Sequence, residues 1–491
     1  MSQNNLERST LGHAALLMLT TRLLVNILSI VSSLVLVRLL SPQDFGVAAI
    51  AMSVYAFVSL FGEFGLNTAL IQKTNPVESD YDTAFTINFL FGLSASLVFW
   101  ILSDSLAAFF EDDRLALVFS VLGLLFIING ALNVKTVTFQ IDMDFKQEMK
   151  LQVFPKLLSF MSTMGLALCM ESYWALILGS ILASLYSLVF SYWMLPFIPK
   201  PSTKGAKSLF GFSKWLMLNN ILLYLNTKSI DLIVGKVIST RAAGIYSISK
   251  EMSSIPSSEI AAPINKASFP AYSRAKNDVV GLRKLYYETK AMITIIALPA
   301  SMGLFVAADF FVPVVLGEQW LESVSVIMTL SVVAFMSSLT SNNNYVFLAI
   351  GKPYISSLLS AIRFTLFFVI LYSFKLYNTV NEPAIALGLA AALSLVLSYV
   401  FLRVIIGVSI VKTIGSVYRP LLSSFFMAAS IALLKFYFEL SPSLGGLLLI
   451  VLLGIFSYCF FLLSFWVLVG RPVSIEQVIM TKLKQQVLRK V

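Results

Sequence analysis

Polar residues lie at helical spacing within the first long apolar stretch of the chain. They are Arg22, Asn26, Ser29 and Ser33, which fall on one face of an α-helix. A charge held at bilayer depth is costly and usually lines a water-filled path or meets a partner charge. The stripe therefore favours a path for a polar cargo. The alternative is that the hydroxyl and amide groups hydrogen-bond neighbouring helices and hold a bundle together.

A second polar stripe follows 198 residues further along the chain. It consists of Asn220, Tyr224, Thr227 and Asp231, again at helical spacing. Lys228 stands three residues before Asp231, close enough on a helix for a purely structural ion pair. Two such stripes that face each other would line a central cavity. We therefore predict a substrate path with residues from both stripes, including Asn226, which belongs to the same segment.

Two further charges within apolar stretches each allow two interpretations. Arg363 lies mid-way along a late stretch and either lines the path or forms a buried salt bridge. Glu63 either pairs with a cation or carries a proton. Glu63 and Asp231 are our candidates for coupling transport to H⁺ or Na⁺, and we expect no other cofactor. Because cations in a cavity offset the desolvation of phosphate or carboxylate, Arg22, Lys228 and Arg363 favour an anionic cargo.

Amides and one more lysine complete the set of candidates. Asn129 and Asn133 are one helical turn apart, and three asparagines cluster at 342–344. Amides can bond sugar hydroxyls without imposing charge, but they also hold helices together. Lys156 lies near the end of its apolar stretch, where we expect it to snorkel to the interface.

The elements that must position these residues are membrane-spanning helices. Of the 491 residues, 58% are hydrophobic and 12% are charged, whereas soluble domains carry about 25% charged residues. Since a spanning helix needs roughly 20 apolar residues, we predict an all-α polytopic membrane protein with about 14 transmembrane helices. The eighth span is the weakest, because charges and Pro256 interrupt it. The predicted spans are 14–37, 45–66, 84–103, 115–135, 150–170, 173–195, 213–237, 243–264, 290–311, 324–347, 354–376, 383–407, 418–439 and 445–469.

The two stripes belong to a weak internal repeat, which sets residues 38–46 against 236–244 and Gly46 against Gly244. Both copies begin a block of six spans and have the same orientation. The repeat thus predicts two six-helix lobes related by a pseudo-two-fold axis along the membrane normal, a known transporter plan. The predicted divisions are an N-terminal lobe (1–198), a C-terminal lobe (199–408), two additional transmembrane helices (409–470) and a cytoplasmic amphipathic tail (471–491).

Charge and composition exclude several classes of function. The net charge is +10, but Lys and Arg concentrate in alternate loops, which places both termini in the cytoplasm by the positive-inside rule. The charge therefore needs no nucleic-acid partner. His13 is the single histidine, which excludes His-based metal sites and triads. No G-x-x-x-x-G-K-[ST] loop is present, and no loop is long enough to hold a catalytic domain, so we expect a transporter and not an enzyme.

Several motifs, spread over most of the chain, resemble those of Wzx-type oligosaccharide flippases. These flippases form the polysaccharide transporter branch of the MOP superfamily, and the likeness is nearest to the subfamily that exports colanic-acid-like exopolysaccharide. The motifs are V-R-L-L-S-P-Q-D-F-G at 37–46, F-G-E-F-G-L-N-T-A-L-I-Q at 61–72, Y-L-N-T-K-S-I-D-L-I-V-G at 224–235, A-G-I-Y at 243–246 and F-V-P-V-V-L-G-E-Q-W at 311–320.

The resemblance implies a function in the bacterial inner membrane. By alternating access, the protein would carry undecaprenyl-diphosphate-linked repeat units from the cytoplasmic to the periplasmic leaflet, for exopolysaccharide, O-antigen or capsule biosynthesis. Asn226, Thr227 and Asp231 match the family pattern directly, whereas Lys228 stands where we expect asparagine. The family's cationic cavity can be matched to the three deep cations, those at 22, 228 and 363, only by depth and face.

Two other readings stay open. A MATE-type drug exporter, coupled to Na⁺ or H⁺, would have a similar helix count, but cationic drugs favour acidic cavities and this one looks basic. A membrane-embedded enzyme or an assembly scaffold for polysaccharide synthesis lacks a visible catalytic cluster. Association with a polysaccharide polymerase and a chain-length regulator is compatible with the flippase reading.

Overall fold

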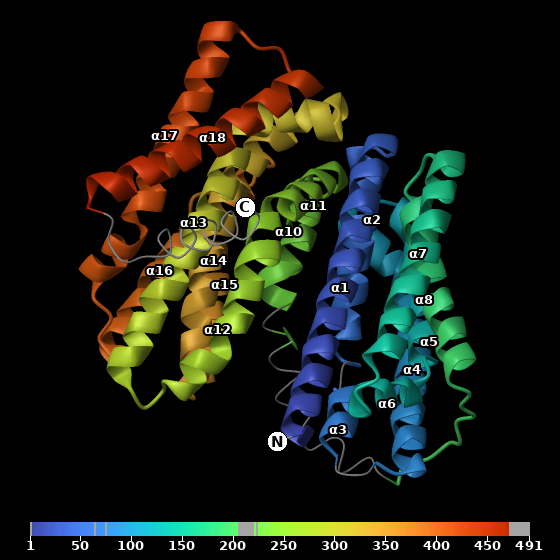
Figure 1. Ribbon diagram of the computed structural model, residues 1–491. Coiled ribbons are helices and arrows are strands. Elements are labelled where there is room, and N and C mark those ends of the chain that lie inside the picture. Colours follow the sequence, from blue (N-terminus) through green and yellow to red (C-terminus); the bar gives the residue numbers. More distant parts are fainter. Residues whose placement is uncertain (1, 63–64, 74–75, 205–219, 222–223, 471–491) are drawn as a thin grey trace, which may run out of the picture. The chain divides into compact units, whose positions relative to one another are not determined.

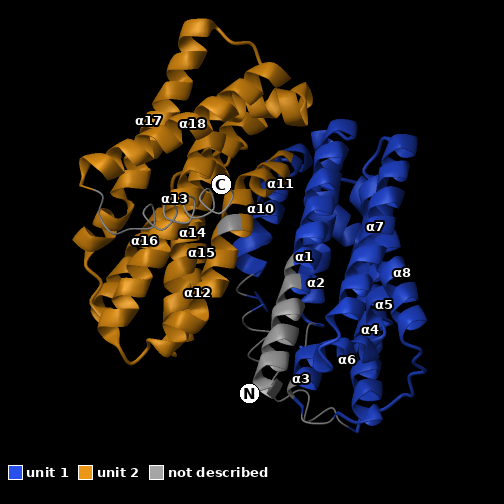
Figure 2. Cartoon of the chain, viewed as in Figure 1, with its two compact units in different colours: residues 1–244 blue, residues 245–491 orange. Residues whose placement is uncertain are grey.

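The computed structural model describes residues 2–62, 65–73, 76–204, 220–221 and 224–470 (Figure 1). Within these ranges the regular elements are all helices, with no β-strand. Helices satisfy their own backbone hydrogen bonds, which suits them to a lipid environment. The chain divides into two compact units, residues 1–244 and 245–491, and the boundary falls inside one helix (Figure 2).

Unit 1 is a bundle whose helices pack pairwise, α4 against α5, α7 against α8 and α1 against α7. Its hydrophobic core contains the buried aromatic rings of Phe99, Phe119 and Phe126 and the aliphatic side chains of Val47 and Ile50. Its elements are α1 (Ser2–Leu39), α2 (Pro42–Ser59), α3 (Leu66–Gln72), α4 (Glu78–Phe110), α5 (Arg114–Gly130), a 3₁₀ turn (Val134–Val137), α6 (Thr138–Ile141), α7 (Phe145–Met170), α8 (Trp174–Met194), α10 (Ser229–Val237) and the first residues of α11 (Thr240–Ile255).

Local sequence explains where α2 begins. Ser41 accepts a hydrogen bond from the Asp44 backbone N–H at 3.2 Å, and Asp44 accepts one from the Ser41 N–H at 3.0 Å. This reciprocal arrangement is a capping box, and Pro42 at the first helical position fits it. Asp44 also accepts a hydrogen bond from the Tyr173 N–H at 3.0 Å, which fixes the start of α8 against the start of α2.

Two glycines let α2 and α11 touch at the backbone within unit 1. A Cβ on Gly46 would lie 1.9 Å from the carbonyl oxygen of Thr240, and a Cβ on Gly244 would lie 1.9 Å from that of Pro42. In the internal repeat, Pro42 aligns with Thr240 and Gly46 aligns with Gly244. Each glycine therefore contacts the residue that aligns with the other glycine's partner, and the contact is reciprocal. A self-complementary contact of this kind is what a two-fold relation between repeats produces.

Unit 2 is built around α13 and α14. The helix α13 packs against α14 and α17, α14 and α15 each pack against α16, and α17 packs against α18. Its elements are the rest of α11, a π-helical turn (Pro256–Ala261), α12 (Ala262–Arg274), α13 (Val279–Phe311), a π-helical turn (Val312–Leu316), a 3₁₀ turn (Glu318–Trp320), α14 (Ser323–Ala349), α15 (Pro353–Ser373), α16 (Glu382–Ile406), α17 (Ile410–Phe438) and α18 (Leu444–Leu468).

Ten helices of the described ranges are long and apolar enough to cross a membrane. An eleventh results if Arg114–Gly130 and Val134–Ile141, which meet at a bend of 59°, form one span. The all-α polytopic class is therefore confirmed, while the count of about 14 stays a prediction. The predicted span 243–264 is helical along its length, because α11, a π-helical turn that begins at Pro256 and α12 follow one another without a gap.

The predicted domain boundaries also stay predictions. The two compact units meet at residue 244, whereas the repeat places the lobe boundary at 198. Packing defines the units and sequence similarity defines the lobes, so the two divisions need not coincide. The predicted tail at 471–491 and the part of the predicted span 213–237 that comprises residues 213–219 and 222–223 lie outside the described residues.

Candidate functional site: an amide-lined cavity

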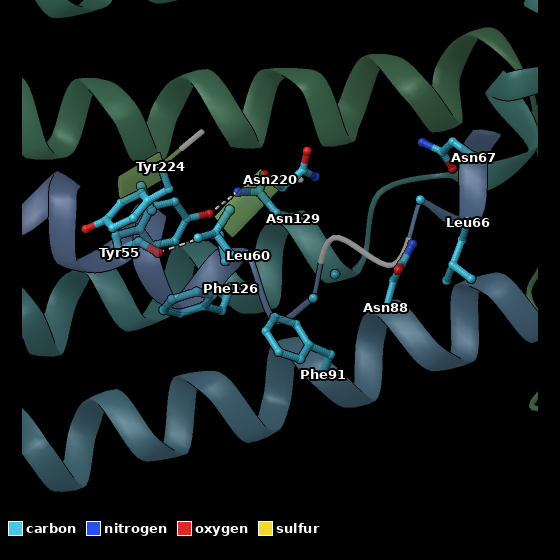
Figure 3. Close-up of a pocket in the computed structure, with 15 residues that line it drawn as sticks. Tyr55, Leu60, Leu66, Asn67, Asn88, Phe91, Phe126, Asn129, Asn220 and Tyr224 are labelled. Atoms are coloured by element: carbon cyan, nitrogen blue, oxygen red, sulfur yellow. Dashed lines mark hydrogen bonds between the residues drawn. The ribbon is translucent and has the colours of Figure 1, made fainter. Parts of the chain in front are cut away.

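Unit 1 contains an open cavity of about 670 Å³. Helices α2, α3, α4 and α5 and the segment before α10 supply its walls. Figure 3 shows Asn67 and Asn88 at one end of the cavity and Tyr55, Asn129 and Asn220 at the other. The polar groups of the described wall are mainly carboxamides, each of which can both donate and accept hydrogen bonds.

Aromatic side chains form much of the remaining wall. Asn129 donates a hydrogen bond from Nδ2 to the Tyr55 hydroxyl at 2.7 Å, and the Tyr55 ring lies 4.5 Å from the Phe126 ring. Tyr224 is buried and donates from its hydroxyl to the Ser53 carbonyl oxygen at 2.9 Å. These contacts fix the orientation of the wall. Flat apolar faces beside amides suit a sugar, which presents C–H faces and hydroxyl edges.

A second cavity of about 480 Å³ shares Asn67, Asn88 and Asn129 with the first and therefore continues it. Its wall adds Gln152 and Lys156 from α7. We expected Lys156 to snorkel to the interface, but the structure places it on this wall. The combined cavity thus contains a cation that the predicted path does not include.

The two asparagines at the end of α5 have different roles. Asn133 is buried, and its Nδ2 donates to the carbonyl oxygens of Ser191 at 3.0 Å and Leu195 at 2.6 Å. Its Oδ1 accepts from the Lys135 N–H at 3.0 Å. Asn133 therefore holds the end of α5 to the end of α8 and lines only the second cavity, whereas Asn129 lines both cavities.

The structure brings only part of the predicted path together. Asn220 and Tyr224 line the first cavity. Arg22 is exposed on α1 and Asn26 is half-buried; neither belongs to the walls described above, although their neighbour Val25 lines the second cavity.

The segment that follows Tyr224 bends before α10. Asn226 is half-buried, Thr227 is exposed, and Lys228 is exposed in a turn. Asp231 is 1% exposed in the first turn of α10. The ion pair between Lys228 and Asp231 stays a prediction, and Glu63 lies outside the described residues.

Arg363 belongs to unit 2, on α15. Its Nη2 donates to the Ser337 hydroxyl on α14 at 3.3 Å, and its buried Nε meets no acceptor among the described residues. Arg363 forms no salt bridge with any described carboxylate. Its guanidinium therefore has hydrogen-bonding capacity to spare, which favours a role in the path over a structural ion pair.

Sequence reasoning also missed Lys290 on α13. It is the first residue of the predicted span 290–311, where a lysine is ordinarily interfacial, yet it is 0% exposed. An aromatic residue, Tyr286, stands one helical turn earlier in the sequence and could have indicated that this face of the helix is buried. Among the described residues no group of three or more His, Cys, Asp or Glu side chains could hold a metal ion.

Comparison with known proteins identifies the family of this chain. A family profile for polysaccharide biosynthesis proteins matches residues 35–325, which is more than half of the chain. The chain belongs to this polysaccharide biosynthesis family. The matched region includes every described lining residue of the first cavity.

Relatives in the family align over most of their length. An uncharacterised membrane protein in the cps region of Klebsiella pneumoniae is 27% identical over 404 residues, which is 81% of this chain and 83% of the relative. The lipopolysaccharide biosynthesis protein WzxC of Escherichia coli (strain K12) is 25% identical over 417 residues, 82% of this chain and 81% of WzxC.

Solved structures show the same architecture. The lipid II flippase MurJ, in an inward closed conformation, aligns with a TM-score of 0.73 at 13% identity and covers 90% of this chain and 99% of MurJ. A multidrug resistance MATE transporter of the MOP superfamily aligns with a TM-score of 0.57 at 14% identity, over 78% of this chain and 94% of that one. The protein thus has the same fold as these two solved structures.

Proposed function

We propose that this protein is a flippase for lipid-linked oligosaccharides. It carries undecaprenyl-diphosphate-linked repeat units from the cytoplasmic to the periplasmic leaflet of the bacterial inner membrane, by alternating access, for exopolysaccharide, O-antigen or capsule biosynthesis. The amide- and aromatic-lined cavity of unit 1, in a chain of the polysaccharide biosynthesis family, is the observation that carries the proposal.

The chemistry of the cavity suits a glycan. A sugar head group in hydrocarbon would leave many polar groups unpaired, at a cost of several kcal/mol each. Carboxamides such as Asn88 and Asn129 replace water at the hydroxyls, and Lys156 offers a positive charge to a phosphate or carboxylate. The lipid tail can stay in the bilayer, so only the head group needs the path.

The finer features of the proposal come from the sequence. Both termini lie in the cytoplasm, and two six-helix lobes alternate the access of the path. Arg22, Lys228 and Arg363 supply further cations, while Glu63 and Asp231 are candidates for coupling to H⁺ or Na⁺. A polysaccharide polymerase and a chain-length regulator are the expected partners. The reciprocal contact between Gly46 and Gly244 supports the two-lobe arrangement.

Drug export is the second candidate, because the MATE fold is similar. Cationic drugs require a carboxylate or a dense aromatic cage at the binding site. The described walls of the unit 1 cavities contain aromatic rings and carboxamides but no carboxylate, and Lys156 adds a positive charge that would repel a cation. This chemistry favours the glycan.

A gene deletion tests the proposal in cells. We expect lipid-linked repeat units to accumulate on the cytoplasmic side and surface polysaccharide to be lost, and the wild-type gene to reverse both effects. Arg22→Ala and Arg363→Ala, at normal membrane levels, should restore polysaccharide poorly, because each removes a cation of the path. Normal polysaccharide in the deletion, in a strain with no second flippase, would contradict the proposal.

A further inference from the structure

Lys290 occupies a buried site in unit 2 that no part of the proposed path uses. Its side chain is 0% exposed, and Nζ donates hydrogen bonds to the Leu339 carbonyl oxygen at 3.2 Å and to Asn343 Oδ1 at 2.9 Å. Both acceptors belong to α14. Two carbonyl acceptors match the two N–H groups of a neutral amine.

Two tyrosine rings cover the rest of the lysine head. Nζ lies 5.2 Å from the centre of the Tyr286 ring and 4.6 Å from that of Tyr399. A ring face attracts an ammonium through its quadrupole but gains little from a neutral amine. The site therefore provides for the third N–H of the protonated form as well. Tyr399 lies on α16, so protonation strengthens the attachment of α13 to α16.

A hydrogen-bond network makes this site part of the helix packing. The Tyr286 hydroxyl donates to Asn343 Oδ1 at 3.1 Å, and Asn343 Nδ2 donates to the Ser398 hydroxyl at 2.6 Å. Asn343 and Ser398 are 0% exposed. Lys290 and Tyr286 of α13 thus both donate hydrogen bonds to the Asn343 side chain of α14, and this amide in turn donates to α16. A change in the charge of Lys290 acts directly on all three helices.

No carboxylate of a described residue forms an ion pair with the ammonium. Lys290 forms no salt bridge with a described residue, and the ionisable side chains that face it are tyrosines: Tyr286 from its own helix and Tyr399 from α16. From α12, Tyr272 accepts a hydrogen bond from Asn342 at 3.0 Å, beside Asn343. The charged groups nearest in sequence on α13 point elsewhere, because Arg283 bonds the Ile406 carbonyl oxygen and Glu288 is exposed.

We propose that Lys290 is the proton-carrying group that couples transport to a proton gradient. The inference rests on the proposed flippase function and deepens it. The Nζ lone pair takes a proton in one conformation and releases it in the other, so NH₂ and NH₃⁺ alternate without any other reactant. A buried ammonium without a counter-ion is costly, and a buried lysine changes its charge readily, which makes this group suited to the task.

Proteoliposomes test the proposal with the full-length protein. The probe is an undecaprenyl-diphosphate-linked repeat unit extracted from the producing cells, and the initial flipping rate is measured under pH differences of either sign. We expect at least a tenfold difference between the two signs for the wild type. Lys290→Met cannot take a proton and Lys290→Arg cannot release one, so both should show less than a twofold difference. Lys284→Met, an exposed lysine of the same helix, should behave as the wild type.

A substitution outside the lysine keeps the test valid if both Lys290 variants fold poorly. Tyr399→Leu removes the ring that favours the ammonium, so the pH midpoint of transport should move to lower pH, whereas Tyr399→Phe keeps the ring and the midpoint. A tenfold response retained in Lys290→Met or Lys290→Arg, or an unchanged midpoint in Tyr399→Leu, overturns the proposal.

A measurement without substrate separates the two proposals. The melting temperature of the purified protein, followed between pH 5 and 9, should show a step in the wild type and in Lys284→Met that Lys290→Met lacks. A step that depends on Lys290 in a protein that flips no lipid would support the proton site and count against the flippase. Active flipping without any such step, and without a response to the pH gradient, would count against Lys290 alone.

Discussion

At the scale of single residues, the cavity of unit 1 depends on amides whose partners differ. Asn129 donates a hydrogen bond to the Tyr55 hydroxyl at the cavity wall, while Asn133 donates to backbone carbonyl oxygens at the end of α8. The same residue type therefore bonds a side chain of the cavity wall at one position and a distant backbone segment four residues later. Substitution of each should affect a different property.

We predict that Asn129→Leu lowers the flipping rate about tenfold, because loss of one hydrogen bond to a hydroxyl is worth about 1.4 kcal/mol. Its melting temperature should stay close to that of the wild type. Asn133→Leu is the matched control, and it should lower the melting temperature because buried carbonyl groups lose their donor. Wild-type flipping by Asn129→Leu would show that this amide does not meet the substrate.

The sequence could predict some of these residues and not others. Asn220 and Tyr224 were predictable, because helical spacing alone puts them on one face. Lys156 and Lys290 were not, since the surroundings of each depend on helices far away in the chain. Both lysines lie near an end of a predicted span, where snorkelling is the ordinary expectation. Asn129 and Asn133 looked equivalent until the partners of each were known.

At the scale of elements, backbone contact at Gly46 and Gly244 sets the distance between α2 and α11. We predict that Gly244→Ala lowers the free energy of unfolding by about 1–3 kcal/mol, the usual cost of overpacking, because the new Cβ would meet the Pro42 carbonyl oxygen. Thermal unfolding of the purified protein measures this. Gly165→Ala on α7 is the control, because a Cβ there meets no atom within 4 Å and should not destabilise the helix. Equal melting temperatures for the two variants would contradict the packing argument.

The loop between α4 and α5 holds the start of α11 through Asp112. Its carboxylate accepts hydrogen bonds from Arg114 Nε at 2.8 Å and Nη2 at 2.6 Å, and from the Thr240 hydroxyl at 2.9 Å. Burial opposes ionisation, but these hydrogen bonds and the Arg114 charge together lower the pKa of Asp112 below its usual value. The folded state therefore prefers the ionised carboxylate.

A lowered pKa in the folded state contributes stability above the unfolded pKa, and this contribution is lost as the pH falls through the folded pKa. We predict that Asp112→Asn destabilises the protein by about 1 kcal/mol at pH 7 and by much less near pH 3. Melting temperatures across this range, with the exposed Asp113→Asn as control, check the difference. A penalty that is the same at both pH values would exclude the ionised carboxylate as its source.

Element positions were predictable where apolar length decides them, as for α13 to α18. Breaks were harder, because hydropathy does not report where the backbone bends. Pro256 marked the weak eighth span, and a π-helical turn does begin there. The bend of 59° after Gly130 gave no comparable signal, because the partners of Asn133 at this bend lie at the distant end of α8.

At the scale of the whole molecule, the family, the fold and the cavity all point to the same function. The family profile assigns the chain to polysaccharide biosynthesis, and the solved structures of MurJ and a MATE transporter show the same fold. The reciprocal glycine contact agrees with the sequence repeat and supports a duplicated origin for the two predicted lobes. Neutral amides and a lysine at the cavity walls then favour a glycan over a cationic drug.

Direct observation of lipid transfer tests this central claim. Purified protein is reconstituted into vesicles that carry an undecaprenyl-diphosphate-linked repeat unit in the inner leaflet, and a membrane-impermeant glycosidase then reports the glycan that reaches the outer leaflet. The account predicts that digestion rises well above the level of protein-free vesicles and falls about tenfold with Asn129→Leu. Digestion at the protein-free level, from the same vesicles that export a cationic dye, would contradict the account and establish drug export instead.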